Sequence, residues 1–160
     1  MFYMVLLPIA GFLVSLPLIL IKMVTLFLLI PPSTECIAVS KAPDPTGAYF
    51  VYAFQIPSGL IGDFPKLAVW PDAYYMTTND FGGPNLDFIG VGIFAFDRSK
   101  MLVGDPAASI IFVDLSQNPS TSNLFQMLPS NVQGQSPPFG TPNFVAGLVA
   151  PEITGDSPME

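Results

Sequence analysis

Apolar and polar residues alternate with the period of a β-strand in the middle of the chain. In residues 49–56 (YFVYAFQI), every even position carries a large apolar side chain, as on the buried face of a strand. Residues 66–70 and 73–78 are similar runs. Pro71 and Asp72 between them fit a type I turn, because proline presets φ at the first central position. This arrangement predicts a β-hairpin.

Three further apolar runs predict additional strands. They are residues 36–39 (CIAV), residues 88–96 (FIGVGIFAF) and residues 109–115 (SIIFVDL). Gly90 and Gly92 fall on one face of the second run, where a neighbouring backbone or aromatic ring can approach closely.

The C-terminal third of the chain carries weaker signals. Residues 101–103 predict a short strand, and residues 116–143 are rich in Ser, Asn, Gln, Pro and Gly, which predicts a loop. Residues 144–149 fit one more strand, and residues 150–160 form an acidic tail that we expect to fray. Because no stretch shows a 3.6-residue period, the pattern predicts an all-β antiparallel domain over residues 35–149.

Aspartates recur along this domain, most of them at predicted turns. They are Asp63, Asp72, Asp80, Asp87, Asp97, Asp105 and Asp114. Short strands with turn signals about 8–12 residues apart are typical of a sandwich, a barrel or a propeller. We therefore expect one of these architectures.

Residues 1–30 are almost wholly apolar, and Lys22 is their sole charged residue. The run before Lys22 is about as long as the roughly 20 residues that cross a bilayer as a helix. We therefore expect an apolar helix that serves as a transmembrane anchor or an export signal. No positive region precedes Phe2 and no small-residue cleavage site follows Ile30, as a secretory signal would require. A start-site or frame error in the translated sequence and a buried core helix stay open as alternatives.

Charge and composition narrow the function classes. The chain has 160 residues, a net charge of −7 and only five basic residues, which form no run. Binding to nucleic acid needs clustered Lys and Arg, so we expect no such partner. The absence of histidine removes the commonest general base and transition-metal ligand. Cys36 is the one cysteine, so no internal disulfide can form, and we expect it to be a small core residue.

Aromatic and polar residues gather around the predicted hairpin and form the best candidate for ligand binding. They are Lys66, Trp70, Asp72, Tyr74, Tyr75 and Asn79. Aromatic rings beside a carboxylate suit a sugar, because the carboxylate accepts hydrogen bonds from hydroxyl groups. The structural alternative is that the aromatic rings stabilise the sheet and that Asp72 is only a turn residue.

We expect no catalytic residues, no cofactor and no metal. Glycoside hydrolysis needs two carboxyl groups about 5–9.5 Å apart, a spacing that sequence alone does not establish for Asp63, Asp72 and Asp97. Residues 79–87 lack the ligand spacing of a calcium loop. The chain contains no P-loop, GxGxxG, GxSxG or CxxC motif. These observations favour a non-enzymatic protein.

Several runs in the domain resemble one family. The runs are CIAVSKAPDPTGAYFVYAF, DFPKLAVWPDAYYMTTN, GIFAFDRSKMLVGDPAAS and PSNVQGQSPPFGTPNF, and they span residues 35–144. They resemble uncharacterised, mostly bacterial secreted proteins, and the string PKLAVWPDAYY is the most distinctive part. The resemblance implies a β-propeller region in a large exported protein, often with Ig-like or PKD-like modules. It implies no particular activity.

A propeller has about 4–8 four-stranded blades, and this chain has strands for one or two. In the family, polar and aromatic β-strand sequence stands where residues 1–30 are apolar here. We therefore expect a partial propeller, as a fragment of a longer protein.

Three function classes stay open. The first is a non-catalytic extracellular or cell-envelope β module for adhesion or scaffolding, with other surface proteins as partners. Residues 1–30 attach it to the membrane if they form an anchor. The second is a carbohydrate-binding or glycosidase-like β-propeller, with glycans as partners. The third is a fragment without a function of its own.

Overall fold

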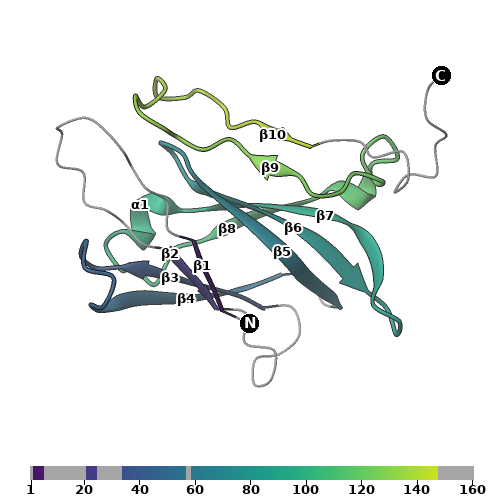
Figure 1. Cartoon of the computed structure of the whole chain (residues 1–160), viewed down its shortest axis with the longest axis horizontal. Helices are drawn as coiled ribbons and strands as arrows, with labels where there is room; N and C mark the ends of the chain where they lie inside the picture. The colour runs from purple at the N-terminus through teal and green to yellow at the C-terminus, as the bar shows by residue number, and fades with distance from the viewer. Residues whose placement is uncertain (1, 6–20, 25–33, 57–58, 148–160) are drawn as a thin grey trace.

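A computed structural model describes residues 2–5, 21–24, 34–56 and 59–147. Its secondary structure is almost entirely antiparallel β-sheet, arranged as two four-stranded sheets and one two-stranded sheet. The sheets lie in three layers, with the β9–β10 pair above the second sheet and the first sheet below it (Figure 1). The prediction of an all-β antiparallel fold is confirmed. Within the described residues the sheets do not close into a barrel or a propeller.

In both four-stranded sheets, strands that follow one another in the chain are also neighbours in space. The first sheet contains β1 (Phe2–Val5), β2 (Ile21–Val24), β3 (Thr34–Ser40) and β4 (Tyr49–Gln55). The second contains β5 (Leu60–Val69), β6 (Tyr74–Gly82), β7 (Asp87–Phe96) and β8 (Ile110–Asp114). The third pairs β9 (Leu128–Pro129) with β10 (Val145–Ala146). Each larger sheet is thus an up-and-down meander.

The predicted hairpin is present as β5 and β6, and the backbone N–H of Trp70 donates to the carbonyl of Ala73 at 3.0 Å. Strand β5 begins earlier than predicted, at Leu60. It pairs with β6 over residues 60–63 and again over residues 66–69, with a shift of register between Asp63 and Lys66. Such bulges accommodate residues that break the alternation used to find strands.

The segment after β7 differs from its prediction. Arg98–Met101 forms α1, a single helical turn, so the short strand expected at residues 101–103 is wrong. The Asp97 side chain accepts hydrogen bonds from Ser99 Oγ at 2.7 Å and from the Lys100 backbone N–H at 3.2 Å. This cap satisfies a free donor of the turn, and Met101 is buried in the core. A second short turn, the 3-10 helix η1 (Leu115–Gln117), follows β8.

The N-terminal expectations fall largely outside the described residues. Of residues 1–30, the structure describes β1 and β2, which pair with each other and with β3. Residues 1, 6–20 and 25–33 lie outside it, so the apolar helix stays a prediction. No helix in the described part is long and apolar enough to span a membrane. The acidic tail of residues 150–160 also lies outside the described part.

The core lies between the two larger sheets. It contains Ile37, Val39, Tyr52, Phe54, Ile56, Tyr74, Met76, Phe94, Phe96 and Met101. The ring centres of Phe54 on β4 and Phe96 on β7 are 5.2 Å apart, which joins the sheets directly. The alternation in residues 49–56 therefore identified the buried face of β4 correctly. Cys36 lies on β3 but is half-buried, with the core residues Ile37 and Val39 at alternate positions, so it is not part of the core.

Candidate functional site

Two of the three aromatic side chains in the predicted ligand cluster, those of Trp70 and Tyr74, are buried in the fold. Trp70 is buried, and its Nε1–H donates to the carbonyl of Thr141 at 2.8 Å. Tyr74 is buried in the core, with the Arg98 guanidinium carbon 5.8 Å from its ring centre. Tyr75 follows Tyr74 on β6 and points to the opposite face of the sheet, because side chains alternate along a strand.

The polar members of that cluster lie apart from one another. Tyr75 Oη donates to Asp72 Oδ2 at 3.1 Å, so these two meet at the exposed end of the hairpin. Lys66 Nζ lies 3.5 Å from the centre of the Phe64 ring. Asn79 is buried, and its Oδ1 accepts from the backbone N–H of Gln126 at 3.0 Å. Among these six residues, the structure shows a side-chain hydrogen bond between Tyr75 and Asp72.

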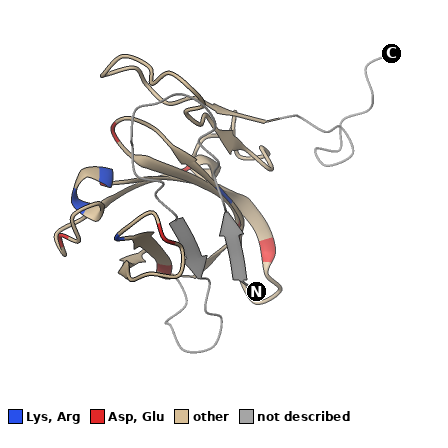
Figure 2. Cartoon of the chain, turned by 60° about the vertical axis from the view of Figure 1, so that its left-hand side comes forward, with Lys and Arg blue, Asp and Glu red and all other residues tan. Residues whose placement is uncertain are grey.

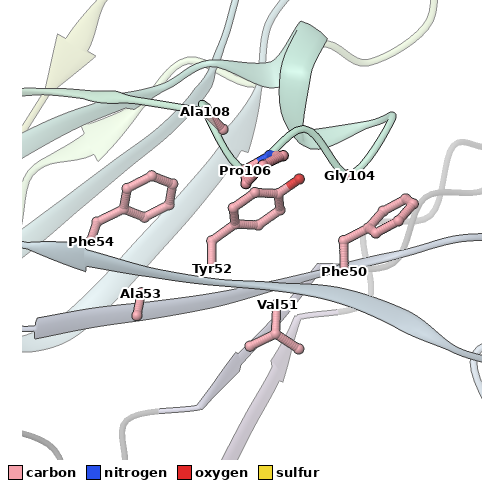
Figure 3. A pocket seen from close by; sticks show the side chains of 8 residues that line it. All are labelled: Phe50, Val51, Tyr52, Ala53, Phe54, Gly104, Pro106 and Ala108. Carbon is pink, nitrogen blue, oxygen red and sulfur yellow. The ribbon is translucent and has the colours of Figure 1, made fainter.

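A pocket of about 280 Å³ lies along strand β4. It is lined by Phe50, Val51, Tyr52, Ala53, Phe54, Gly104, Pro106 and Ala108. The rings of Phe50, Tyr52 and Phe54 lie on the side of the 104–108 loop, whereas Val51 and Ala53 point away from it (Figure 3). Strand β4 is the last strand of its sheet, so the pocket adjoins an edge that no described strand covers. The lining carries no charged side chain, so nothing in it would neutralise a bound ion.

Gly104 fixes the loop side of this pocket. Its φ is +74°, in the left-handed region that glycine adopts without strain. A Cβ atom at this position would clash with the ring of Phe50. Glycine is therefore required both for the backbone conformation and for the close approach of the ring.

Within the described residues, the outer face of the second sheet is covered over one half only. On the β5–β6 half, Thr77 Oγ1 donates to the carbonyl of Met127 at 2.6 Å, which holds the segment leading into β9 against the sheet. On the β8 side, Ile111 is 68% exposed and Val113 is 47% exposed. The outer face of the first sheet carries a similar apolar position, Val51, which is 73% exposed. Contiguous exposed apolar surface is typical of interaction sites, and Ile111 and Val113 lie on the same face of β8.

Two carboxylates face the space between the sheets. Glu35 on β3 is 5% exposed and lies on the same side of its strand as Ile37 and Val39. Asp80 on β6 is 2% exposed and lies on the same side as Tyr74. The sequence did not predict this pair, because Asp80 falls in a stretch expected to form a turn. Both residues could be recognised from strand periodicity, because each stands an even number of positions from the buried apolar residues of its strand and so points to the same face.

One oxygen of Asp80 is satisfied and the other is not. Thr78 Oγ1 donates to Asp80 Oδ1 at 2.6 Å, whereas Asp80 Oδ2 has no hydrogen-bond partner in the described part of the chain. A buried polar atom without a partner costs about 1–3 kcal/mol, and more when it is charged.

Two glycines provide the space that these carboxylates occupy. A Cβ atom at Gly62 would lie 2.8 Å from Glu35 Oε1, and a Cβ atom at Gly92 would lie 2.6 Å from Asp80 Oδ2. The Gly92 position would also lie 2.9 Å from the ring of Phe112. The prediction that Gly92 marks a close approach is therefore confirmed.

Burial raises the pKa of both carboxyl groups. It raises the pKa of Glu35 to about 7, with a smaller contribution from the negative charge of Asp80. It raises the pKa of Asp80 to about 6, where the hydrogen bond from Thr78 acts in the opposite direction. Burial also raises the pKa of Asp114 on β8, but hydrogen bonds from Ser116 and Gln117 outweigh it and leave that pKa below its ordinary value.

The charges of the described residues are scattered over the ribbon rather than gathered in one patch (Figure 2). No group of three or more Cys, Asp and Glu residues in the described part is placed to hold a metal ion. Because burial raises the pKa of both groups, Glu35 and Asp80 are suited to holding a proton.

No family model matches the sequence, and neither a curated protein nor a solved structure matches it. The resemblance to secreted propeller-like proteins therefore stays a prediction from motifs.

Proposed function

We propose that this chain is a non-catalytic β module of the extracellular space or cell envelope, and that it serves adhesion or scaffolding within a larger propeller-like protein. The observation that carries the proposal is the half-covered outer face of the second sheet. Ile111 and Val113 stand exposed on β8, beside a half of the same face that the chain itself covers. An apolar face of this kind fits contact with further β-structure.

The connectivity of the sheets supports the propeller part of the proposal. Each four-stranded sheet is an antiparallel meander, which is also the arrangement of a propeller blade. The two sheets pack face to face through Phe54 and Phe96. In this proposal, β9 and β10 begin a third layer, and further strands complete it over Ile111 and Val113.

The proposed location rests on the sequence. Residues 1–30 are apolar enough to act as a transmembrane or signal-like segment, and the motifs resemble exported proteins. The proposed partners are other surface proteins, since the exposed positions are apolar and uncharged.

The test compares the full chain with a variant that carries Ile111→Asp and Val113→Asp. We expect the original chain to self-associate as concentration rises, and to bind a dye that fluoresces on exposed apolar surface. Both signals are expected to fall at least severalfold in the variant. Light scattering coupled to size-exclusion chromatography measures the first signal.

The matched control is Phe139→Asp, which removes an almost fully exposed apolar residue from a loop. It should leave both signals unchanged. A monomeric chain without dye binding, or equal effects of the face variant and the control, would contradict the proposal.

A further inference from the structure

The two sheets bring two carboxylates together, and among the described residues no salt bridge involves either of them. Glu35 enters from β3 and Asp80 from β6, both on the faces that pack together. The salt bridge formed by the described residues joins Lys100 to Asp97, at a different place in the fold. A buried carboxylate without a counter-charge is strongly unfavourable, and two of them repel each other as well.

Most of the charged groups on the elements that pack against this pair are acidic. The titratable groups that face or flank it are Asp114 on β8, the exposed Asp63 on β5, the exposed Asp87 on β7 and the thiol of Cys36 on β3. Strand β4 contributes no charged residue. Strand β5 also carries Lys66, which pairs in register with Thr77 and not with Asp80. On β2 the charged residue is Lys22, which pairs in register with Ala38 and not with Glu35.

The unpartnered oxygen of Asp80 indicates that the site lacks a hydrogen-bond donor. A carboxylate oxygen only accepts hydrogen bonds, whereas a protonated carboxyl group also donates one. The side chain of Asp80 is almost fully buried, and its Oδ2 has no donor in the described part of the chain. A proton on either carboxyl group removes one negative charge and supplies the donor that this site lacks.

We propose that Glu35 and Asp80 form a proton-dependent latch between the two sheets, which is closed while the pair retains a proton and loosened when both groups ionise. Opening releases the proton to solvent and leaves two carboxylates to repel each other across the sheet interface. No metal, oxidant or other reactant takes part.

The direction of the pH dependence follows from the raised pKa values. Because burial raises the pKa of Glu35 to about 7 and that of Asp80 to about 6, the folded chain keeps protons that the unfolded chain has already released. The stabilisation is full below about pH 4, the ordinary range of these groups. It is lost as the pH rises through 6 and 7. The low pKa of Asp114 acts only on the acid side of this window.

The test is the thermal melt of the full chain, followed by circular dichroism between pH 5 and pH 8. We expect Tm to fall by roughly 5–10 °C over this range, since about 1 kcal/mol shifts Tm by a few degrees in a chain of this size. Glu35→Gln should remove most of this dependence and should match or exceed the original Tm at pH 8. Asp87→Asn, which removes an exposed carboxylate from the same sheet, should retain the dependence.

A second measurement needs no variant. Infrared spectra of the original chain should show the C=O band of a protonated, buried carboxyl group at pH 6, and this band should be absent at pH 8. A flat melting profile, an undiminished slope in Glu35→Gln, or the absence of the band at pH 6 would each overturn the proposal. A rise in Tm on adding calcium at pH 8 would also overturn it, because the pair would then be a cation site.

Discussion

The ring of Phe54 on β4 lies 5.2 Å from the ring of Phe96 on β7, with 50° between the two planes. Phe96 in turn stacks on Phe94, at 5.9 Å and nearly parallel. The contact between Phe54 and Phe96 connects two sheets that share no backbone ladder among the described residues. Each such pair contributes about 0.5–1.5 kcal/mol beyond the burial of its surface.

Phe54→Ala should therefore be among the most destabilising changes in the chain. We expect a loss of about 3–5 kcal/mol of unfolding free energy, because a large cavity opens between the sheets. Urea denaturation measures this loss. Phe139→Ala, at an exposed loop position, should change stability by less than about 0.5 kcal/mol. A loss below about 1 kcal/mol for Phe54→Ala would show that the sheets do not pack at this point.

Trp70→Phe distinguishes a structural role from a ligand-binding role. The change keeps an aromatic ring but removes the donor to the carbonyl of Thr141, so we expect a loss of about 1–3 kcal/mol. Denaturation measures the loss, and a glycan panel run on both proteins gives the second readout. Unchanged stability together with lost glycan binding would instead favour the carbohydrate-binding alternative.

Gly104→Ala tests the loop beside strand β4. We expect it to cost clearly more than Gly140→Ala, although both positions have positive φ, +74° and +83°. At Gly140 a Cβ atom meets nothing within 4 Å, so only the backbone strain of about 1 kcal/mol remains. At Gly104 the Cβ atom also displaces the ring of Phe50. Equal losses in two parallel denaturation curves would argue against that contact.

Gly92→Ala tests the space around the buried carboxylates. The added Cβ atom meets both Asp80 Oδ2 and the ring of Phe112, so we expect a loss of about 1–3 kcal/mol from overpacking. The loss should be accompanied by an altered pH dependence of Tm, because the carboxylate must move. If Gly92→Ala changes neither the stability nor the pH profile of Tm, the Asp80 carboxylate does not lie against Gly92.

Much of the fold could be predicted because it depends on local alternation. Residues 49–56 gave the buried face of β4, and Pro71 with Asp72 marked the turn between β5 and β6. The single turn at Arg98–Met101 escaped because it is too short to show a helical period. The start of β5 at Leu60 escaped because a bulge interrupts the alternation.

The candidate site could not be predicted in the same way. Glu35 and Asp80 lie on different sheets, and no local pattern fixes how one sheet packs on another. The alternation along each strand places each residue on a buried face, but it does not identify which residue of the other sheet lies opposite. The aromatic hairpin is ambiguous for a related reason, because Trp70 and Tyr74, which are buried here, are typical both of ligand sites and of sheet cores.

The chain-order arrangement of the strands has a consequence for how the protein forms. Because every ladder of the larger sheets joins consecutive strands, most backbone pairings close short loops and have low sequence separation. Such topologies fold faster than β-proteins in which distant segments must pair. The first sheet contains no residue beyond Gln55, so its strands can pair while the later ones are still being synthesised. We therefore expect the second sheet to assemble on the first, so that the layers form in the order of synthesis.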